Sequence, residues 1–207
     1  MIETMPRWWL LCALLPAVVF SQIIPFESNG LKYKALTRGG VTIMFARLPT
    51  QVRDFAILQV AISNGSPVSW AVRPEDFRFE GDDGRVVQAL PARTVVDELL
   101  SHASRSDVSH LVKAYEGALY GNTQMHSTNG YEARREDALA EIGPNKLKAA
   151  AAASAIALVT TKLAPGQSTD GAVFYPHGRR PLGSGKLIAQ VAGEQFVFPV
   201  EAEPARK

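Results

Sequence analysis

Residues 55–63, FAILQVAIS, are apolar at almost every position. Successive side chains of an extended strand point to opposite faces, so this segment has an apolar surface on both of its faces. One face carries Ala56, Leu58, Val60 and Ile62, and the other carries Phe55, Ile57 and Ala61. Such a strand is typical of a layered fold in which both faces are covered, and the segment is therefore predicted to be a central strand.

Shorter segments alternate apolar and polar residues, as strands with one buried face do. In residues 41–46, the large apolar Val41, Ile43 and Phe45 alternate with Thr42, Met44 and Ala46. Residues 68–72 place Trp70 on one face with Val68 and Val72. The indole of Trp70 is therefore predicted to point into the core. Further strands are predicted over residues 156–163 and 171–175.

The tetrapeptide NGSP at 64–67 follows the predicted central strand directly. Asn64-Gly-Ser66 matches the pattern of an N-glycosylation acceptor, but Asn, Gly and Ser also favour tight turns. Because Pro67 follows the pattern and disfavours glycan transfer, the turn is the preferred interpretation.

Turn residues between alternating segments also predict two tight hairpins. They are 77–80 with 85–90 around Asp82-Asp83-Gly84, and 186–192 with 195–200 around Gly193-Glu194. In the second hairpin, the apolar residues of the two strands are expected to face the same side.

Between residues 91 and 155 the apolar residues recur at helical spacing instead. Val95 and Leu99 begin this pattern, and an alanine-rich segment at 146–155 ends it. With seven or eight short strands around this helical middle, the chain is predicted to be mainly β, an immunoglobulin-like β-sandwich with an inserted helical segment.

The N-terminus has the order of a secretory signal peptide, with one Arg before an apolar run and a small residue after it. Cleavage after Ser21 would make residues 1–21 the signal peptide and 22–207 a single β-sandwich domain with its helical insertion at about 91–155. An uncleaved anchor is the alternative, because Trp8 to Ile24 approaches the length of about 17 to 25 residues that spans a bilayer.

Charge and cysteine content narrow the class of protein further. The chain has 22 basic and 20 acidic residues, a formal net charge of +2, and no basic tract, so no nucleic-acid partner is expected. Its one cysteine, Cys12, lies inside the proposed signal peptide, so the mature chain would contain no disulfide and no thiolate site. These features favour an exported protein of a bacterial envelope, periplasmic or extracellular.

Ser168 lies between two glycines in the segment APGQSTDGAVFYP. A hydrolase nucleophile elbow, G-x-S-x-G, needs a strand before the serine and a helix after it. Here Pro165-Gly166 signals a turn, the second glycine comes one residue late, and a strand-like segment follows. Ser168 is therefore predicted to be a turn residue, and no catalytic residue is assigned.

Four histidines, His102, His110, His126 and His177, are the remaining candidates for chemistry. His102 and His110 are eight residues apart, about 12 Å along a helix at about 1.5 Å per residue, which is too far to bind one metal ion. No metal site and no cofactor are expected. If the protein were a small hydrolase, His102, His110 and Asp107 would be the residues to test.

The segment HGRRP at 177–181 is the densest positive patch. It has the charge to meet an acidic ligand, but basic residues at a sheet edge also discourage edge-to-edge aggregation. The second interpretation is preferred.

The strand and turn segments together resemble a loose group of bacterial exported immunoglobulin-like domains of uncharacterised function. The resemblance rests on VAISNGSPVSW, PEDFRFEGDDGRVVQAL and LAPGQSTDGAVFYP, and it covers about 55–90 and 160–200. It implies an immunoglobulin-like fold, and it carries over no catalytic residue.

The sequence thus favours an exported, non-enzymatic β-sandwich that binds another envelope protein or a surface component, with a membrane contact only through an uncleaved signal segment. Two alternatives remain, a small hydrolase and a small-ligand carrier, each with a site between the helical insertion and the sheet.

Overall fold

The computed structural model describes residues 22–28, 31–48, 54–102, 150, 153–154, 156–178 and 182–202. Its strands in chain order are β1 Ile24–Ser28, β2 Leu31–Arg38, β3 Val41–Arg47, β4 Phe55–Asn64, β5 Trp70–Val72, β6 Phe77–Gly81, β7 Val86–Gln88, β8 Thr161–Leu163, β9 Ser168–Pro176, β10 Gly185–Val191 and β11 Glu194–Val200. A 3₁₀ helix, η1, spans Pro74–Asp76, and one α-helix, α1, spans Ala92–His102.

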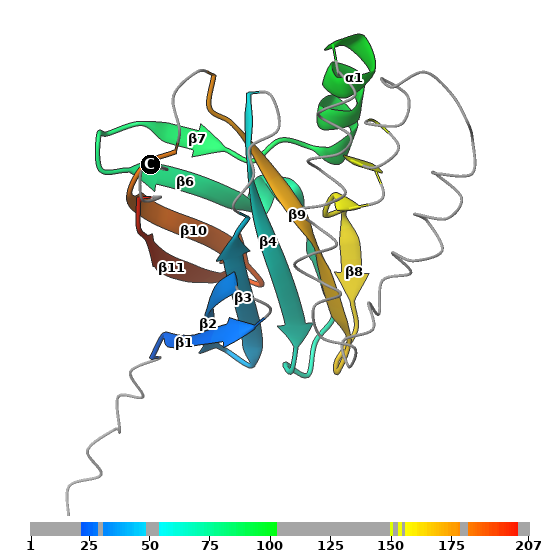
Figure 1. Ribbon diagram of the computed structural model, residues 1–207. Helices are drawn as coiled ribbons and strands as arrows, with labels where there is room; N and C mark the ends of the chain where they lie inside the picture. Colours follow the sequence, from blue (N-terminus) through cyan, green and yellow to red (C-terminus); the bar gives the residue numbers. More distant parts are fainter. Residues whose placement is uncertain are drawn as a thin grey trace, which may run out of the picture.

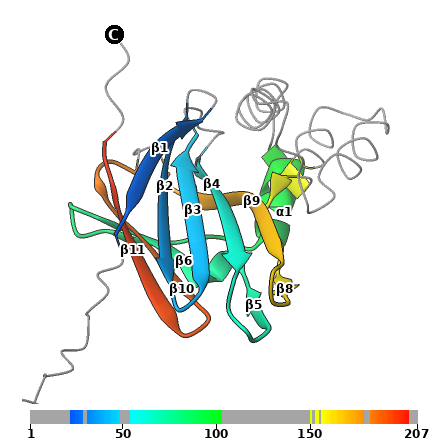
Figure 2. The ribbon, with the colours of Figure 1, turned by 90° about the horizontal axis from the view of Figure 1, so that it is seen from below.

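The strands form antiparallel sheets that pack in layers (Figures 1 and 2). One sheet has five strands in the order β1-β2-β3-β4-β9, a second has four in the order β11-β10-β6-β7, and β5 pairs with β8 in a small third sheet. The prediction of a mainly β sandwich with a helical insertion is confirmed.

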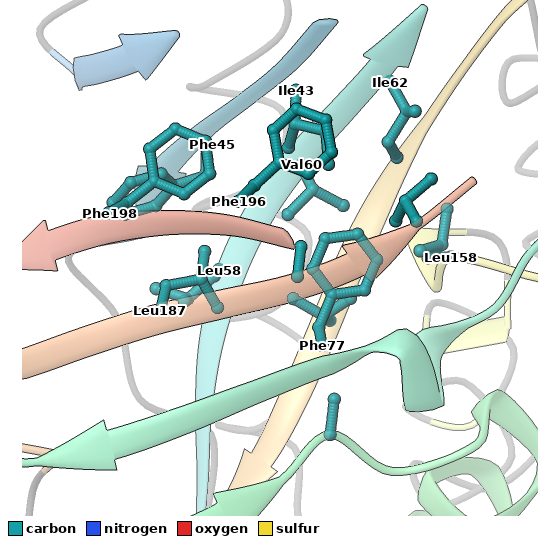
Figure 3. Packing of buried hydrophobic residues seen from close by; sticks show 14 of the residues in the cluster. Ile43, Phe45, Leu58, Val60, Ile62, Phe77, Leu158, Leu187, Phe196 and Phe198 are labelled. Atoms are coloured by element: carbon teal, nitrogen blue, oxygen red, sulfur yellow. The ribbon is translucent and has the colours of Figure 1, made fainter. Parts of the chain in front are cut away.

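The space between the five-stranded and four-stranded sheets is filled by apolar side chains from both (Figure 3). Phe45 of β3 meets Phe198 of β11 with ring centroids 5.0 Å apart at an interplanar angle of 65°, an edge-to-face contact between the sheets. Leu58, Val60 and their even-numbered neighbours in β4 point into this inner core.

The opposite face of the five-stranded sheet carries a second core beneath α1. Phe55 and Ile57 of β4 and Phe174 of β9 pack there with Val95 and Leu99 of the helix. β4 is therefore buried on both faces, as its two-sided apolar sequence predicts. The alanine-rich segment contributes to this layer, since Ala150 and Ala153 are buried in the same cluster, while most of 103–155 lies outside the described residues.

Several details differ from the predictions for local reasons. The second hairpin turns at Ala192-Gly193, one residue earlier than predicted, because Val191 pairs with Glu194. The predicted strand at 156–163 is shorter: Ile156 is still helical, Ala157 makes an isolated parallel bridge to β9, and β8 begins at Thr161.

The predicted buried face of residues 68–72 differs from the structure at Val68. β5 begins at Trp70, and Val68, which was predicted to share its buried face, is 63% exposed. Trp70 is half-buried at the margin of the inner core, and its indole N–H donates to the Ser66 hydroxyl at 3.4 Å. The preceding turn holds Val68 outside the strand, so the alternation of 68–72 does not translate into a single buried face.

β1 and β2 were not predicted. β1 is an edge strand with Pro25 as its second residue and mostly exposed side chains, so it lacks the apolar alternation of a core strand. β2 continues into β3 through a two-residue turn, Gly39-Gly40, in which both residues have positive φ, 52° and 78°. Glycine adopts this conformation without strain, which accounts for the tight hairpin.

Candidate functional site

The described residues cover the outer face of the five-stranded sheet only in part. Strand register defines a cross-strand row, Phe26, Tyr33, Ala46, Gln59 and Ala172, in which the last three residues are buried. Side by side with it runs a second row, Ile24, Ala35, Met44, Ala61 and Asp170, none of which is fully buried. The helical cover therefore ends near the first row.

The part of this face that the described residues leave uncovered, which we name the open sheet face, consists of Ile24, Phe26, Tyr33, Ala35, Met44 and Ala61. Ile24 and Phe26 are 62% and 41% exposed, and the other four are half-buried. The Phe26 and Tyr33 rings stack with centroids 5.2 Å apart and planes 10° apart. The result is a mostly apolar surface with an aromatic pair at the β1 edge.

Polar groups lie within the open sheet face and beside it. Burial raises the pKa of the Tyr33 hydroxyl, and the nearby negative charge of Asp170 raises this pKa further. Tyr33 therefore stays protonated at neutral pH and can donate a hydrogen bond. On the next row, the hydroxyls of Thr37 and Thr42 lie 2.8 Å apart.

Gln59 lies where the helical cover and the open sheet face meet. Its side chain is 2% exposed, and its Oε1 has no hydrogen-bond partner among the described residues. An acceptor left in this state costs about 1–3 kcal/mol relative to one that is hydrogen-bonded. Gln59 is thus a buried acceptor at the junction between the helical insertion and the sheet.

Ser168 is the first residue of β9 and is exposed. Its backbone follows a turn at Pro165-Gly166 that is closed by Gln167, whose N–H donates to the Ala164 carbonyl at 3.0 Å and whose Oε1 accepts from the Ala164 N–H at 2.9 Å. A strand follows the serine where a nucleophile elbow has a helix. Ser168 thus belongs to the strand start, directly after the predicted turn.

Asn64 is 0% exposed, and both ends of its side-chain amide are bound. Its Nδ2 donates to the carbonyls of Val68 and Leu163, and its Oδ1 accepts from the N–H and hydroxyl of Ser66. The amide therefore holds the turn after β4 against β8, and a buried, fully bonded asparagine offers no nitrogen for a glycan.

The histidines do not converge in the described part of the chain. His102 is exposed at the end of α1, one turn after the exposed Glu98. His177 follows β9, and its backbone N–H donates to the Asp54 carbonyl at 2.8 Å. His110, His126 and Asp107 lie outside the described residues, as do residues 179–181 of the positive patch. Within the described ranges, no three His, Cys, Asp or Glu side chains form a group that could hold a metal ion.

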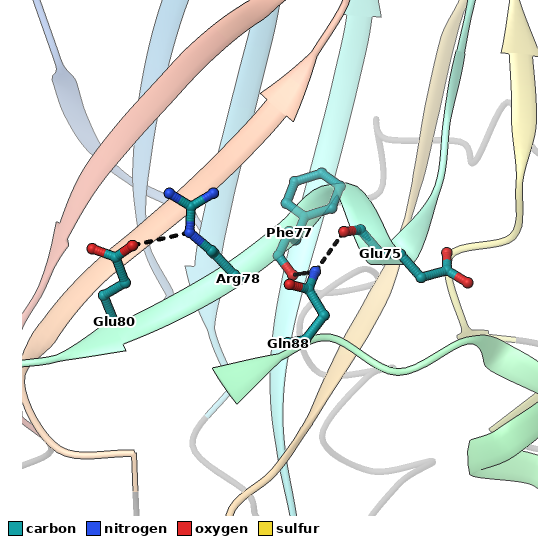
Figure 4. A network of polar contacts seen from close by, with 5 residues as sticks. All are labelled: Glu75, Phe77, Arg78, Glu80 and Gln88. Atoms are coloured by element: carbon teal, nitrogen blue, oxygen red, sulfur yellow. Dashed lines mark hydrogen bonds and ion pairs between the residues drawn. The ribbon is translucent and has the colours of Figure 1, made fainter. Parts of the chain in front are cut away.

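A polar network on the four-stranded sheet has a structural role (Figure 4). The side-chain amide of Gln88 in β7 donates to the carbonyls of Glu75 and Phe77, which ties η1 to the hairpin. Arg78 and Glu80 form an ion pair at 2.9 Å on the same sheet. The Gln88 amide thus holds η1 against the hairpin, and the ion pair lies along β6.

No helix among the described residues is long and apolar enough to cross a membrane.

The sequence analysis does not identify the open sheet face, because it does not predict β1. The signal that indicates it is the short segment IPFES, which has the proline of an edge strand, followed by the alternating apolar residues Leu31, Tyr33 and Ala35 of β2.

Comparison with known proteins adds little to this picture. No family model matches the chain, and no curated protein matches it. Among solved structures, the chain is similar to the crystal structure of the yjhA protein from Bacillus subtilis, with 9% sequence identity, coverage of 86% of this chain and 96% of that one, and a TM-score of 0.37. A likeness this distant carries no inference about activity or partner.

Proposed function

We propose that the protein is an exported, non-enzymatic β-sandwich that binds another envelope protein or surface component through the open sheet face. The observation that carries the proposal is the exposure of Ile24 and Phe26 next to half-buried Tyr33 and Met44. Contiguous exposed apolar surface marks interaction sites, and aromatic residues and methionine are enriched in interfaces.

The layering of the sheet supports a binding role for this face. α1 covers the part of the face over Phe55, Ile57 and Phe174, and the apolar surface continues past the helix towards β1. A partner placed there would extend the cover over the sheet and remove Ile24 and Phe26 from water. The stacked rings of Phe26 and Tyr33 add a rigid aromatic anchor of the kind that dominates binding energy.

Site-specific photo-crosslinking in intact cells tests the proposal. A photoreactive residue at Phe26 is expected to give one reproducible adduct with an envelope component, and the same residue at the exposed Gln190 of β10 is expected to give none. Equal labelling from both positions would contradict the proposal.

Charge substitutions provide a matched second test. Ile24→Lys is expected to weaken the crosslinked complex at least tenfold, because a charge buried in an apolar interface is desolvated without a partner. Val86→Lys is the control, since Val86 of β7 is 65% exposed, close to the 62% of Ile24, and lies in the other sheet. Both variants should unfold at the wild-type temperature.

One observation favours the small-ligand carrier as a second candidate. Oε1 of Gln59 is buried and has no partner among the described residues, and its strand neighbours Ala46 and Ala172 belong to the core beneath α1, so an N–H or O–H of a ligand there would satisfy it. Gln59→Leu separates the candidates: it should abolish ligand binding by a carrier, and it should leave the Phe26 crosslink of a binding module unchanged.

A further inference from the structure

β11 is an edge strand of the four-stranded sheet. Its hairpin with β10 has a two-residue loop closed by the pair Val191 and Glu194. The closing pair of such a hairpin is hydrogen-bonded, and bonded and non-bonded pairs alternate along an antiparallel ladder. The backbone N–H and C=O groups of Gln195 and Val197, and the C=O of Pro199, therefore point away from β10, out of the sheet edge.

Two of these three outward carbonyls are bound by basic side chains of β2. Nη1 of Arg38 donates to the Gln195 carbonyl at 2.8 Å, and Nζ of Lys34 donates to the Pro199 carbonyl at 2.7 Å. Leu36, between these two residues in β2, is buried in the inner core. Lys34, Leu36 and Arg38 share one face of β2, so this face points towards the four-stranded sheet. The edge of β11 is thus capped by side chains from the opposite sheet.

The other covered edge in the described structure is closed differently. β9 lies at the far end of the five-stranded sheet. Its Phe174 carbonyl accepts a hydrogen bond from the Leu90 N–H at 2.9 Å, and its Ala172 carbonyl accepts one from the Leu158 N–H at 2.8 Å. Backbone groups close β9, whereas β11 depends on two long and partly exposed side chains. Substitution can remove these caps without breaking a backbone ladder.

We propose that Lys34 and Arg38 keep β11 from pairing with β11 of a second copy of this chain, and that this edge is the protein's latent self-association surface. Two such edges fit antiparallel about a two-fold axis at Val197. Each Val197 would exchange two backbone hydrogen bonds with its counterpart, and each Gln195 N–H would reach the Pro199 carbonyl of the other copy. Basic residues at sheet edges oppose pairing of this kind.

The test is the oligomeric state of the full-length Lys34→Met/Arg38→Met variant, measured by size-exclusion chromatography with light scattering over a range of concentrations. Methionine keeps most of the apolar stem and removes the donors. The variant is expected to associate into dimers at least tenfold more tightly than the wild type. Lys162→Met/Arg93→Met is the control, because it removes the same two charges from exposed positions in β8 and α1, away from β11, and should behave as the wild type.

A third substitution locates the contact. Val197→Pro removes the outward N–H at the proposed two-fold axis. Pro199, two residues later in β11, has the same orientation relative to β10, so the strand already contains a proline at an equivalent position. Added to the uncapped variant, it is expected to return association to the wild-type level. Circular dichroism and urea unfolding establish that each variant is folded; if the double variant is not, Lys34→Met and Arg38→Met are measured singly with the same expected direction.

Three results would overturn the proposal. The first is an uncapped, folded variant with the same mass as the wild type at every concentration. The second is equal association of the charge control, which would point to net charge alone. The third is association that persists with Val197→Pro, which would place the contact away from β11.

Discussion

Tyr175 of β9 is a fully buried residue of the inner core, and its hydroxyl has no hydrogen-bond partner among the described residues. Burial raises its pKa well above the usual value, so the hydroxyl stays protonated in the folded protein. We expect Tyr175→Phe to raise the free energy of unfolding by about 1 kcal/mol, because the unpaired hydroxyl loses its hydration on folding and gains nothing in return. Urea unfolding measures the change.

Tyr33→Phe is the control for this expectation. The Tyr33 hydroxyl is only partly buried and lies near the Asp170 charge, so its removal should leave stability unchanged or lower it. If Tyr175→Phe instead lowers the free energy of unfolding, as removal of a hydrogen-bonded buried hydroxyl does, the Tyr175 hydroxyl has a partner in the folded protein.

At the scale of elements, the β6–β7 hairpin depends on Asp83 in its turn. Asp83 accepts hydrogen bonds from the backbone N–H and the side chain of Arg85, and these lower its pKa from the usual 3.8. A carboxylate with a lowered folded-state pKa contributes stability above its unfolded pKa and loses it as pH falls through the folded pKa. Acidification below about pH 4 should therefore weaken the hairpin, as followed by amide exchange of β7.

Asp83→Asn should remove this part of the pH dependence while keeping an acceptor in the turn. Asp76 of η1 is expected to have the opposite effect on the pH dependence of stability, because burial raises its pKa despite the hydrogen bond from the Arg73 N–H. Asp76→Asn should therefore increase stability most at neutral pH. Identical acid sensitivity in the wild type and Asp83→Asn would assign the effect to other carboxylates.

The contact between β9 and the end of the helical insertion depends on Gly171. A Cβ at this position would lie 2.6 Å from Cα and 2.7 Å from N of Leu158, so only glycine fits. Gly171→Ala is expected to lower stability by about 1–3 kcal/mol, because the backbone at Leu158 must move and its hydrogen bond to Ala172 must lengthen. Thermal unfolding measures the loss.

Gly166→Ala is the companion variant. Gly166 has φ +78° but nothing within 4 Å of its added Cβ, so it tests backbone strain without a clash. Proteolysis near residues 150–158 should increase for Gly171→Ala and stay unchanged for Gly166→Ala. Equal proteolysis of both would show that close packing at Gly171 is not what holds this segment.

At the scale of the whole molecule, the proposed export has a direct test. β1 begins at Ile24, so cleavage after Ser21 would leave the complete β1–β2 hairpin and the open sheet face in the mature protein. N-terminal sequencing of the exported form is expected to begin near Gln22. Recovery of the intact Met1 terminus in a membrane fraction would indicate an anchored protein instead.

Much of the fold was predictable from local pattern. The two apolar faces of β4 require cover on both sides, and the structure has the four-stranded sheet on one face and α1 on the other. The Asp82-Asp83-Gly84 turn was equally predictable, because Gly84 has φ 81° and tight turns need such residues. Patterns that depend on backbone geometry or on the burial of one segment are visible in the order of residues.

The open sheet face was not predictable, because its residues come from β1, β2, β3 and β4 and meet only through strand register. For the same reason, the sequence contained no sign that Lys34 and Arg38 would bind carbonyls 165 and 157 residues away. Alternation along the chain determined which side of a strand is apolar. Which strands lie at an edge, and which apolar face the described residues leave uncovered, depended on long-range pairing, and only the tertiary structure decided that.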